Sequence, residues 1–312
     1  MTASVLVTGA GNGIGQATAL RLAHAGYKVF ATARTRDEAD RLSTRAKEEG
    51  LDLRATALDV SDPHACEATF ADIADLTDGG PDAVVNADGF AVARAVEDVT
   101  EETAHRLMEI NTFAAVRIAR LALPAMRRRG RGRIVNLSSA AGRSVLPLGG
   151  WYGASRAASA ALTHALRMEL AGSGVQIVLV EHGFHATGLL EDAIRSLTPP
   201  SGISTGFTDC YRNAAAALSD STRFGSPEPA AAIVHRALAA RRPRARYTVG
   251  MDARIAAPLI ASLPYAISDP IKRLVLGLSG PQAASRLMST LGGLPHLPQR
   301  KPGRQPEAQE RS

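Results

Sequence analysis

A glycine-rich string near the N-terminus constrains the fold more than any other feature of this sequence. The β-branched run Ser4–Thr8 leads directly into Gly9-Ala10-Gly11-Asn12-Gly13-Ile14-Gly15, and a helix-periodic stretch follows it. Glycines let a backbone turn tightly and approach a phosphate closely, while the start of a helix supplies amide donors and a positive dipole. A glycine-rich turn alone is a weak indicator, but its place between a first strand and a helix predicts a dinucleotide phosphate site.

Short β-branched runs alternate with helix-periodic stretches through about the first 250 residues. The stretch Gly15–Ala25 is typical of the helices, and Gly26 follows it as a helix-ending residue. Strands that alternate with helices predict a parallel sheet with helices on both faces. We therefore expect an α/β, doubly wound (Rossmann) fold of seven strands. The candidate strands are Ser4–Thr8, Lys28–Ala33, Asp52–Val60, Asp82–Ala87, Arg133–Ser139, Val175–Gly183 and Arg246–Gly250.

Two regions interrupt this alternation. The segment 183–226 is too long for a simple connection and contains Pro199 and Pro200, and loops of that length are usually lids, binding loops or disordered segments. After Gly250, short helical pieces are punctuated by prolines. We expect a dinucleotide-binding and catalytic domain over residues 1–250, a C-terminal helical extension over 251–294 and a polar, disordered tail over 295–312.

The net charge of +6 raises the question of a nucleic-acid partner. The densest basic cluster comprises Arg127, Arg128, Arg129, Arg131 and Arg133. It follows an apolar-periodic stretch that ends near Met126, where basic residues complement a helix C-terminus. Aromatic residues make up only 4% of the chain and do not interleave with the cluster, so bases would lack a stacking platform. A solvated helix end is therefore the better interpretation, and we expect no nucleic-acid partner.

The cysteines and the apolar segments bear on the compartment. Cys66 and Cys210 have no zinc-type spacing, which favours two buried thiols in a reducing cytosol and no metal site. The N-terminus lacks the basic and long apolar regions of a signal peptide. The most apolar later segment, residues 255–267, is short and interrupted by prolines, so it cannot span a bilayer unaided. We expect a cytoplasmic protein with no integral membrane segment.

The end of the second predicted strand bears on the choice of cofactor. This strand reads Ala31-Thr32-Ala33 and is followed by Arg34. An NAD site favours an acidic residue here for the ribose hydroxyls, whereas an arginine can face the 2′-phosphate of NADP. The alternative is an ordinary exposed loop arginine. We favour NADP(H).

Several motifs in order along residues 3–250 resemble the classical short-chain dehydrogenase/reductase family. Thr8 to Gly15 fits its TGxxxGxG motif, Asp59-Val60 its adenine-contacting pair, and Asn111 its helix asparagine. Ser139, Tyr152 and Arg156 match its Ser–Tyr–Lys arrangement in spacing, with arginine in the lysine position (YxxxR). Residues 247–254 are similar to the branch that contains 17β-hydroxysteroid dehydrogenases.

The resemblance implies hydride transfer between a nicotinamide and a carbonyl or alcohol. Tyr152 would be the general acid/base, Ser139 would orient the substrate oxygen, and Asn111 would hold a water in a proton relay. Arg156 completes the implied catalytic set. The implied cofactor contacts are Gly9, Asn12, Gly13, Ile14, Gly15, Arg34, Asp59, Val60, Asn86, Gly89, Tyr152, Arg156 and Thr187.

By the same resemblance the 183–226 loop would line the substrate pocket, and a homodimer or homotetramer is usual. The loop is apolar, which favours a small hydrophobic substrate such as a bulky ketone, although the same residues could simply pack the loop itself. They are Phe184, Leu189, Leu190, Ile194, Leu197, Ile203, Phe207 and Tyr211.

Three departures from the family pattern fall at the nicotinamide half. Arg156 keeps a positive charge but does not readily lose its proton, which would impair a relay through this position. Asp88 puts a carboxylate where the family has a methyl group, and we hypothesise that it forms a compensating pair with Arg156. The segment Glu181-His182-Gly183 replaces the usual Pro-Gly, and His185 adds a second imidazole.

Two functions therefore remain open. The first is an NADP(H)-dependent oxidoreductase that reduces a hydrophobic ketone, or oxidises the alcohol, with Tyr152 as acid/base. The alternative keeps the dinucleotide site but performs a cyclisation, isomerisation or dehydration, or only binds. His182, His185 or Asp88 would then be the new acid/base groups, because a fold does not fix the chemistry that it carries.

Overall fold

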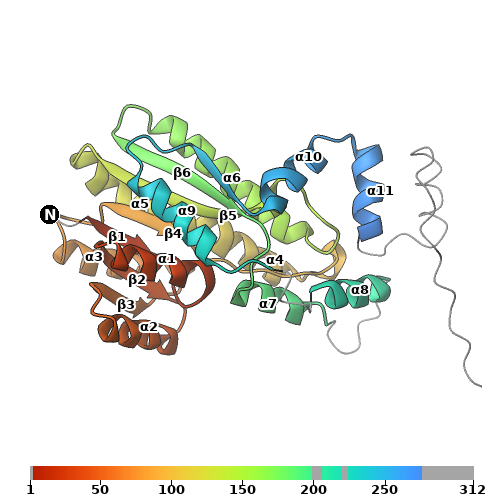
Figure 1. Ribbon diagram of the computed structural model, residues 1–312, viewed down its shortest axis with the longest axis horizontal. Coiled ribbons are helices and arrows are strands. Elements are labelled where there is room, and N and C mark those ends of the chain that lie inside the picture. Colours follow the sequence, from red (N-terminus) through yellow and green to blue (C-terminus); the bar gives the residue numbers. More distant parts are fainter. Residues whose placement is uncertain (1–2, 199–205, 219–223, 276–312) are drawn as a thin grey trace, which may run out of the picture.

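A seven-stranded parallel sheet forms the centre of the computed structural model, which describes residues 3–198, 206–218 and 224–275 (Figure 1). The strand order is β3-β2-β1-β4-β5-β6-β7, and every neighbouring pair is parallel. The doubly wound fold expected from the sequence is confirmed. The strands are β1 (Ser4–Val7), β2 (Lys28–Ala33), β3 (Leu53–Ala57), β4 (Ala83–Asn86), β5 (Gly132–Ser139), β6 (Val175–His182) and β7 (Arg246–Val249).

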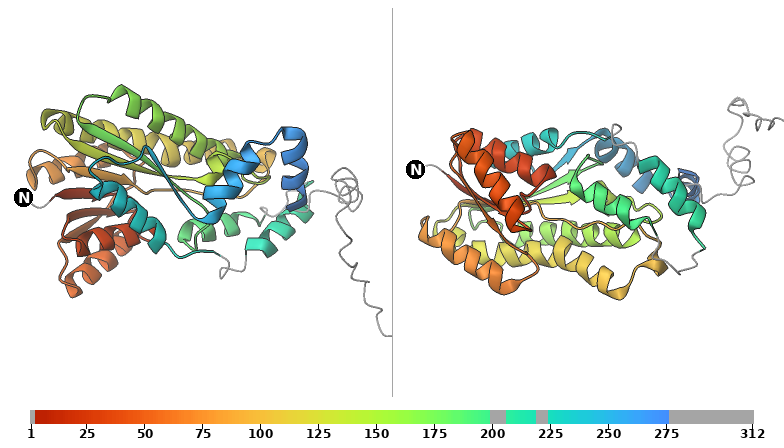
Figure 2. Two further views of the ribbon diagram at one scale, coloured as in Figure 1. Left: turned by 45° about the horizontal axis from the view of Figure 1, so that its top comes forward. Right: turned by 90° about the horizontal axis from the view of Figure 1, so that it is seen from below.

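Helices cover both faces of the sheet, as Figure 2 shows. The α-helices of the described residues are α1 (Gly13–His24), α2 (Arg36–Glu48), α3 (Pro63–Asp75), α4 (Glu101–Met108), α5 (Ala114–Arg128), α6 (Gly150–Glu169), α7 (Gly188–Ser196), α8 (Thr208–Leu218), α9 (Glu228–Ala239), α10 (Ala257–Ala261) and α11 (Tyr265–Val275). The 3₁₀ turns η1 (Val96–Asp98) and η3 (Ala140–Gly142) and the π-helical turns η2 (Glu109–Phe113) and η5 (Asp252–Ala256) join them.

Alternate residues of each strand enter two separate cores. Val5 and Val7 of β1 pack with α1, α2 and α9 on one face. Leu6, between them, packs with α3 and α5 on the other face. Both sides of the strands are thus buried, which is why the strands read as continuous apolar runs. The chain reverses its direction of winding between β1 and β4, and the carboxyl ends of strands at such a point form a ligand crevice.

Two arginines of the basic cluster at the end of α5 bind backbone carbonyl groups, and two others are exposed to solvent. Arg129 donates to the carbonyl oxygens of Asp78, Gly80 and Pro81, and Arg133 donates to carbonyls at the C-terminal end of α9. Arg127 and Arg128 are exposed. The expected solvated helix end therefore holds for these two side chains, whereas Arg129 and Arg133 bind the backbone.

Two sequence expectations need correction in their boundaries. The third strand was expected to reach Val60, but β3 ends at Ala57 because the Asp59 carboxylate accepts hydrogen bonds from the backbone and hydroxyl of Ser61 and turns the chain. The 183–226 segment contains the helices α7 and α8 rather than an irregular loop.

The C-terminal region is described only as far as residue 275, and the remaining expectation concerns the cysteines. Residues 252–275 form η5, α10 and α11, and Figure 1 places α10 and α11 at the same end of the molecule as α7 and α8. The expected tail over 295–312 lies outside the described residues. Cys66 and Cys210 are both buried and free, as expected. Within the described ranges, no helix has the length and apolar character needed to cross a membrane.

Candidate active site

The glycine-rich string forms a cradle at the start of α1. Gly9 and Gly13 have φ angles of +66° and +55°, a region that side chains other than glycine rarely adopt. A Cβ atom on Gly15 would collide with the carbonyl oxygen of Gly9. Asn12 precedes the helix without capping it through its side chain, so the first amides of α1 remain available to a ligand. The cradle fits the pyrophosphate of a dinucleotide.

A cleft of about 310 Å³ opens above this cradle, at the carboxyl ends of the strands. It brings together most of the residues that the sequence nominated as cofactor contacts; Asn86 and Tyr152 are not among its walls. The walls shared with the sequence prediction are Gly9, Asn12, Gly13, Ile14, Gly15, Arg34, Asp59, Val60, Gly89, Arg156 and Thr187.

Glu38 is a cleft residue that sequence reasoning missed. Its carboxylate accepts hydrogen bonds from Asn12 Nδ2 and from the backbone of Thr35, both at 3.3 Å, and it lies where a Cβ atom of Gly11 would be. Thr35 and Glu38 form a capping box at the start of α2. The spacing of a capping box is visible in the sequence. That the carboxylate also reaches the glycine loop, close to Arg34, is visible only in the structure.

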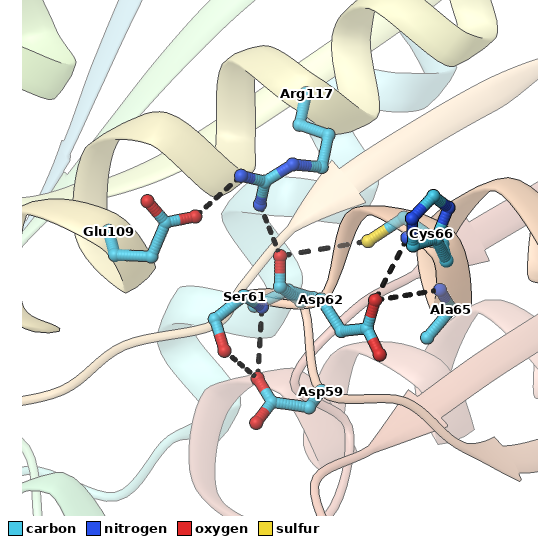
Figure 3. A network of polar contacts seen from close by, with 9 residues as sticks. Asp59, Ser61, Asp62, Ala65, Cys66, Glu109 and Arg117 are labelled. Atoms are coloured by element: carbon cyan, nitrogen blue, oxygen red, sulfur yellow. Dashed lines mark hydrogen bonds and ion pairs between the residues drawn. The ribbon is translucent and has the colours of Figure 1, made fainter.

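The loop after β3 is bound by a side chain of α5 (Figure 3). Arg117 of α5 donates to the carbonyl oxygen of Val60 and to Glu109, each at 2.6 Å. The hydrogen bonds from Ser61 lower the pKa of the Asp59 carboxyl. Asp59 is therefore ionised in ordinary buffers, and its loop is fixed against the π-helical turn η2.

Asn111 lies in that turn, and its side chain is occupied by the protein. Its amide exchanges two hydrogen bonds with the backbone of Phe90, both 2.8 Å long, and donates to Ser155 Oγ at 2.9 Å. Single π-helical turns inside a helix are common at functional sites. The side chain of Asn111 thus fixes the loop between β4 and η1 (residues 87–95, hereafter the 90s loop) to α6.

Ser139 and Tyr152 come from the end of β5 and the first turn of α6. Ser139 Oγ accepts from the backbone of Ala141 at 3.2 Å and caps η3. Tyr152 is partly buried, and the guanidinium carbon of Arg156 lies 5.3 Å from the centre of its ring. A fixed positive charge therefore lies between the cofactor cleft and the tyrosine.

Arg156 is almost fully buried. Its Nη1 atom donates to the carbonyl oxygen of Leu137 at 3.4 Å, and its Nη2 atom occupies the space that a Cβ of Gly89 would need. No carboxylate oxygen of Asp88 lies within 4.0 Å of its nitrogen atoms, so the hypothesised pair does not form a direct ion pair. Burial raises the pKa of Asp88 to about 6, against a hydrogen bond from Thr8 and the attraction of Arg156, which both lower it.

His182 and His185 share one acceptor. The Nδ1 atoms of the two rings lie 2.7 and 3.0 Å from the carbonyl oxygen of Gly183, and the ring centres are 5.5 Å apart, edge to face. The pKa of His182 is lowered to about 4, chiefly by burial and in smaller part by the neighbouring Arg156 and His185. His182 also lines the cleft, so a neutral imidazole faces the cofactor site.

The comparisons with known proteins agree with this geometry. The model of the short chain dehydrogenase family matches residues 3–197. The chain belongs to the short-chain dehydrogenase/reductase family. It is 30% identical over 279 residues to a probable short-chain type dehydrogenase/reductase, VdlC, of Helicobacter pylori, which covers 87% of this chain and 97% of that protein.

Two solved structures are similar to this chain in fold. A short-chain dehydrogenase from Streptomyces avermitilis superposes with a TM-score of 0.72 at 28% identity, covering 89% of this chain and 98% of the other. The actinorhodin polyketide ketoreductase, solved with NADPH, gives a TM-score of 0.67 at 27% identity, covering 80% and 95%.

Glu181 has a structural role, because its carboxylate is paired with arginines. It is buried in β6, and its carboxylate lies 2.7 Å from Arg143 Nη2, just after η3, and 3.8 Å from Arg246 Nη1 of β7. The pairing with two arginines compensates the burial of its charge. Within the described ranges, no group of three or more His, Cys, Asp or Glu side chains is arranged to hold a metal ion.

The apolar residues of the 183–226 segment divide between packing and the cleft. Leu197 and Tyr211 are buried in a small separate core with Ala95 and Leu148, so for these two the interpretation as loop packing is correct. Leu189 lines the cleft. Phe184 is exposed, and it follows the cleft residue His182 by two positions in the sequence. Ile203 lies outside the described residues.

Proposed function

We propose that this chain is an NADP(H)-dependent oxidoreductase that reduces a hydrophobic ketone, or oxidises the corresponding alcohol, by hydride transfer. The observation that carries the proposal is the position of Arg156, which lies over the ring of Tyr152 and also lines the glycine-rich cleft. One charged side chain thus joins the candidate proton donor to the candidate cofactor site.

The residues of the site divide the work as follows. NADPH, when bound, supplies the hydride. Ser139, at the end of β5, donates a hydrogen bond to the substrate oxygen, and Tyr152 gives that oxygen its proton during reduction or takes it back during oxidation. Arg156 stabilises the negative charge that develops on the phenol oxygen as the proton leaves. Asn111 keeps the 90s loop against α6, through Phe90 and Ser155.

The preference for NADP(H) rests on Arg34, which lines the cleft and is exposed after β2. Its guanidinium can bind a 2′-phosphate in a bidentate way. Glu38 acts against this preference, because its carboxylate lies nearby on the glycine loop. An actinorhodin ketoreductase of similar fold was solved with NADPH, which supports the same choice.

The proposal of a hydrophobic substrate is supported by apolar side chains near the start of α6. Val96 and Val145 are exposed, and they contact the positions of Gly150 and Gly153 on either side of Tyr152. Trp151 donates to the carbonyl oxygen of Val96 at 3.3 Å. These side chains would contact an apolar substrate that approaches Tyr152, as expected for a ketone of the polyketide or steroid type. The assignments to a cytoplasmic homodimer or homotetramer and to the 17β-hydroxysteroid dehydrogenase-like branch belong to the same proposal.

The test is NADPH consumption by the purified protein across a panel of hydrophobic ketones, with NADPH and NADH binding followed by nicotinamide fluorescence. We expect turnover that Tyr152→Phe lowers at least a hundredfold without a change in NADPH binding. Tyr265→Phe, at an exposed position on α11, is the matched control. Arg34→Ala should weaken the binding of NADPH and leave that of NADH unchanged.

Other outcomes discriminate the alternatives. Tight binding of NADPH without consumption of any ketone would favour the alternative function, a cyclisation, isomerisation or dehydration. Asp88, His182 or His185 would then be the acid/base. A large gain in turnover for Arg156→Lys would show that the native site is compromised or repurposed for hydride transfer.

A further inference from the structure

A small side chamber adjoins the cofactor cleft beneath Asp88. Its volume is about 10 Å³, roughly that of one water-sized sphere. Asp88 and Arg156 border both spaces, together with Leu137. The chamber is also bordered by Asn86 and by Asn111, so its wall is polar on one side.

Three buried polar atoms from the walls of this chamber have no hydrogen-bond partner in the protein. They are Asn86 Oδ1, Asp88 Oδ2 and Arg156 Nε. The orientation of the Asn86 amide is set by its Nδ2 atom, which donates to Asn136 Oδ1 at 2.7 Å. Its oxygen is therefore an acceptor that the sheet leaves unpaired. A buried polar atom without a partner costs about 1–3 kcal/mol, so three around one cavity require an explanation.

A water molecule matches this set of atoms by donor and acceptor count. The Nε–H group of Arg156 is a donor, whereas the amide oxygen of Asn86 and the carboxylate oxygen of Asp88 are acceptors. A water that accepts one hydrogen bond and donates two satisfies all three. Buried waters typically make about three such bonds.

We propose that the side chamber is a water site, and that Asp88 acts through this water as the positioning residue of Arg156. The bridge takes the place of a direct ion pair. It holds the guanidinium in the one orientation that places Nη1 on Leu137 and Nη2 against Gly89. The proposal rests on the proposed function only in that Arg156 belongs to its catalytic set.

The bridge depends on the protonation state of Asp88. As a carboxylate, Asp88 accepts from the water; as a carboxylic acid, it offers a proton of its own and weakens the arrangement. The charged groups that act on it are Arg156 of α6 and Asp59 of the loop after β3, and Thr8 donates to it from the end of β1. The walls from α5 are apolar: Ala114, Ala115 and Ile118.

The test uses the full chain without cofactor or substrate, so it does not depend on turnover. Carbon-13 NMR of aspartate-labelled protein follows each carboxyl group with pH, and loss of one resonance in Asp88→Asn assigns that of Asp88. We expect its midpoint at or below about pH 6, because the water donates a hydrogen bond to the ionised carboxylate. We expect Arg156→Met, which removes the charge and the Nε donor, to raise this midpoint by about one pH unit or more. Asp72→Asn, on the exposed side of α3, should leave it unchanged.

A crystal structure of the wild type supplies the second readout. We expect one water within hydrogen-bond distance of Asn86 Oδ1, Asp88 Oδ2 and Arg156 Nε. We expect it to lose its third partner in Arg156→Lys, which keeps the charge but lacks Nε. An Asp88 midpoint that Arg156→Met leaves unmoved would overturn the proposal. A dry chamber in the wild type would do the same. Failure of the ketone panel would leave both readouts intact, so the two proposals fail separately.

Discussion

His182 lies beside Ser139, in register across the parallel strands β5 and β6. Partners in a parallel register point to the same face of the sheet, so the imidazole and the candidate oxygen-positioning hydroxyl share one end of the active site. Burial lowers the pKa of the imidazole and the like charge of Arg156 adds to this, whereas the hydrogen bond between Nδ1 and the Gly183 carbonyl opposes it. The ring is therefore kept neutral at a place where the family pattern has proline.

This arrangement predicts that His182 makes the protein sensitive to acid. The folded-state pKa of about 4 lies below the ordinary value of 6.5, so the unfolded chain takes up a proton first as pH falls. The stability contributed by neutral His182 is present above pH 6.5 and is lost as pH falls toward 4. Between pH 6.5 and pH 4 the wild type loses free energy of unfolding as the unfolded chain takes up this proton. We expect His182→Asn to avoid this loss, which amounts to up to about 3 kcal/mol. Urea unfolding at pH 7.5 and pH 4.5 measures the difference, and His64→Asn, at an exposed position, is the control.

Asp88 predicts a dependence of opposite sign. Its folded-state pKa of about 6 lies above the ordinary value of 3.8, so folding favours the protonated form. This stability is present below pH 3.8 and is lost as pH rises through 6. Asp88→Asn resembles the protonated form, and we expect it to be more stable than the wild type by up to about 3 kcal/mol above pH 6, with no gain near pH 4. Equal effects at both pH values would contradict a raised pKa.

Gly89 and Arg156 should be energetically coupled. A methyl group on Gly89 would meet Nη2 of Arg156, so Gly89→Ala must displace the guanidinium from the cleft wall. We expect a loss in NADPH affinity of about tenfold, equivalent to about 1.4 kcal/mol. The shorter side chain of Arg156→Lys makes room, so the double variant should recover most of the loss, as a double-mutant cycle would measure. Gly206→Ala, where a Cβ meets nothing within 4 Å, should have no effect.

Tyr211 anchors α8 to the 90s loop. Its hydroxyl accepts from the backbone of Ala95 at 2.9 Å and donates to Asp98 at 2.6 Å. Tyr211→Phe leaves the Ala95 amide buried without this acceptor, and we expect a loss of about 1–3 kcal/mol in stability and faster proteolysis within 183–226. Burial raises the pKa of Tyr211 to about 12, so the effect should not change between pH 6 and 9. Tyr265→Phe should behave as the wild type.

The conformation of the glycine-rich turn is predictable from the sequence, because its signals are local. A tight turn with positive φ at Gly9 and Gly13 requires glycine whatever surrounds it. The contribution of Glu38 was missed, because its reach onto the glycine loop joins two segments that the sequence separates by more than 25 residues. Whether Asp88 and Arg156 form a direct ion pair could not be decided from the sequence for a related reason. Proximity along the sheet edge follows from topology, but the direction of a long side chain depends on what fills the space around it.

The sequence by itself determined the alternation of strands and helices, the glycine cradle and the order of the candidate catalytic residues, because periodicity and turn chemistry act over a few neighbouring residues. Only the tertiary structure decided that Arg156 lies against Tyr152 and Gly89, that His182 is neutral beside Ser139, and that three unpaired polar atoms meet in one small chamber. These features depend on desolvation and on contacts between distant segments, which exist only once the sheet and its helices have closed around them.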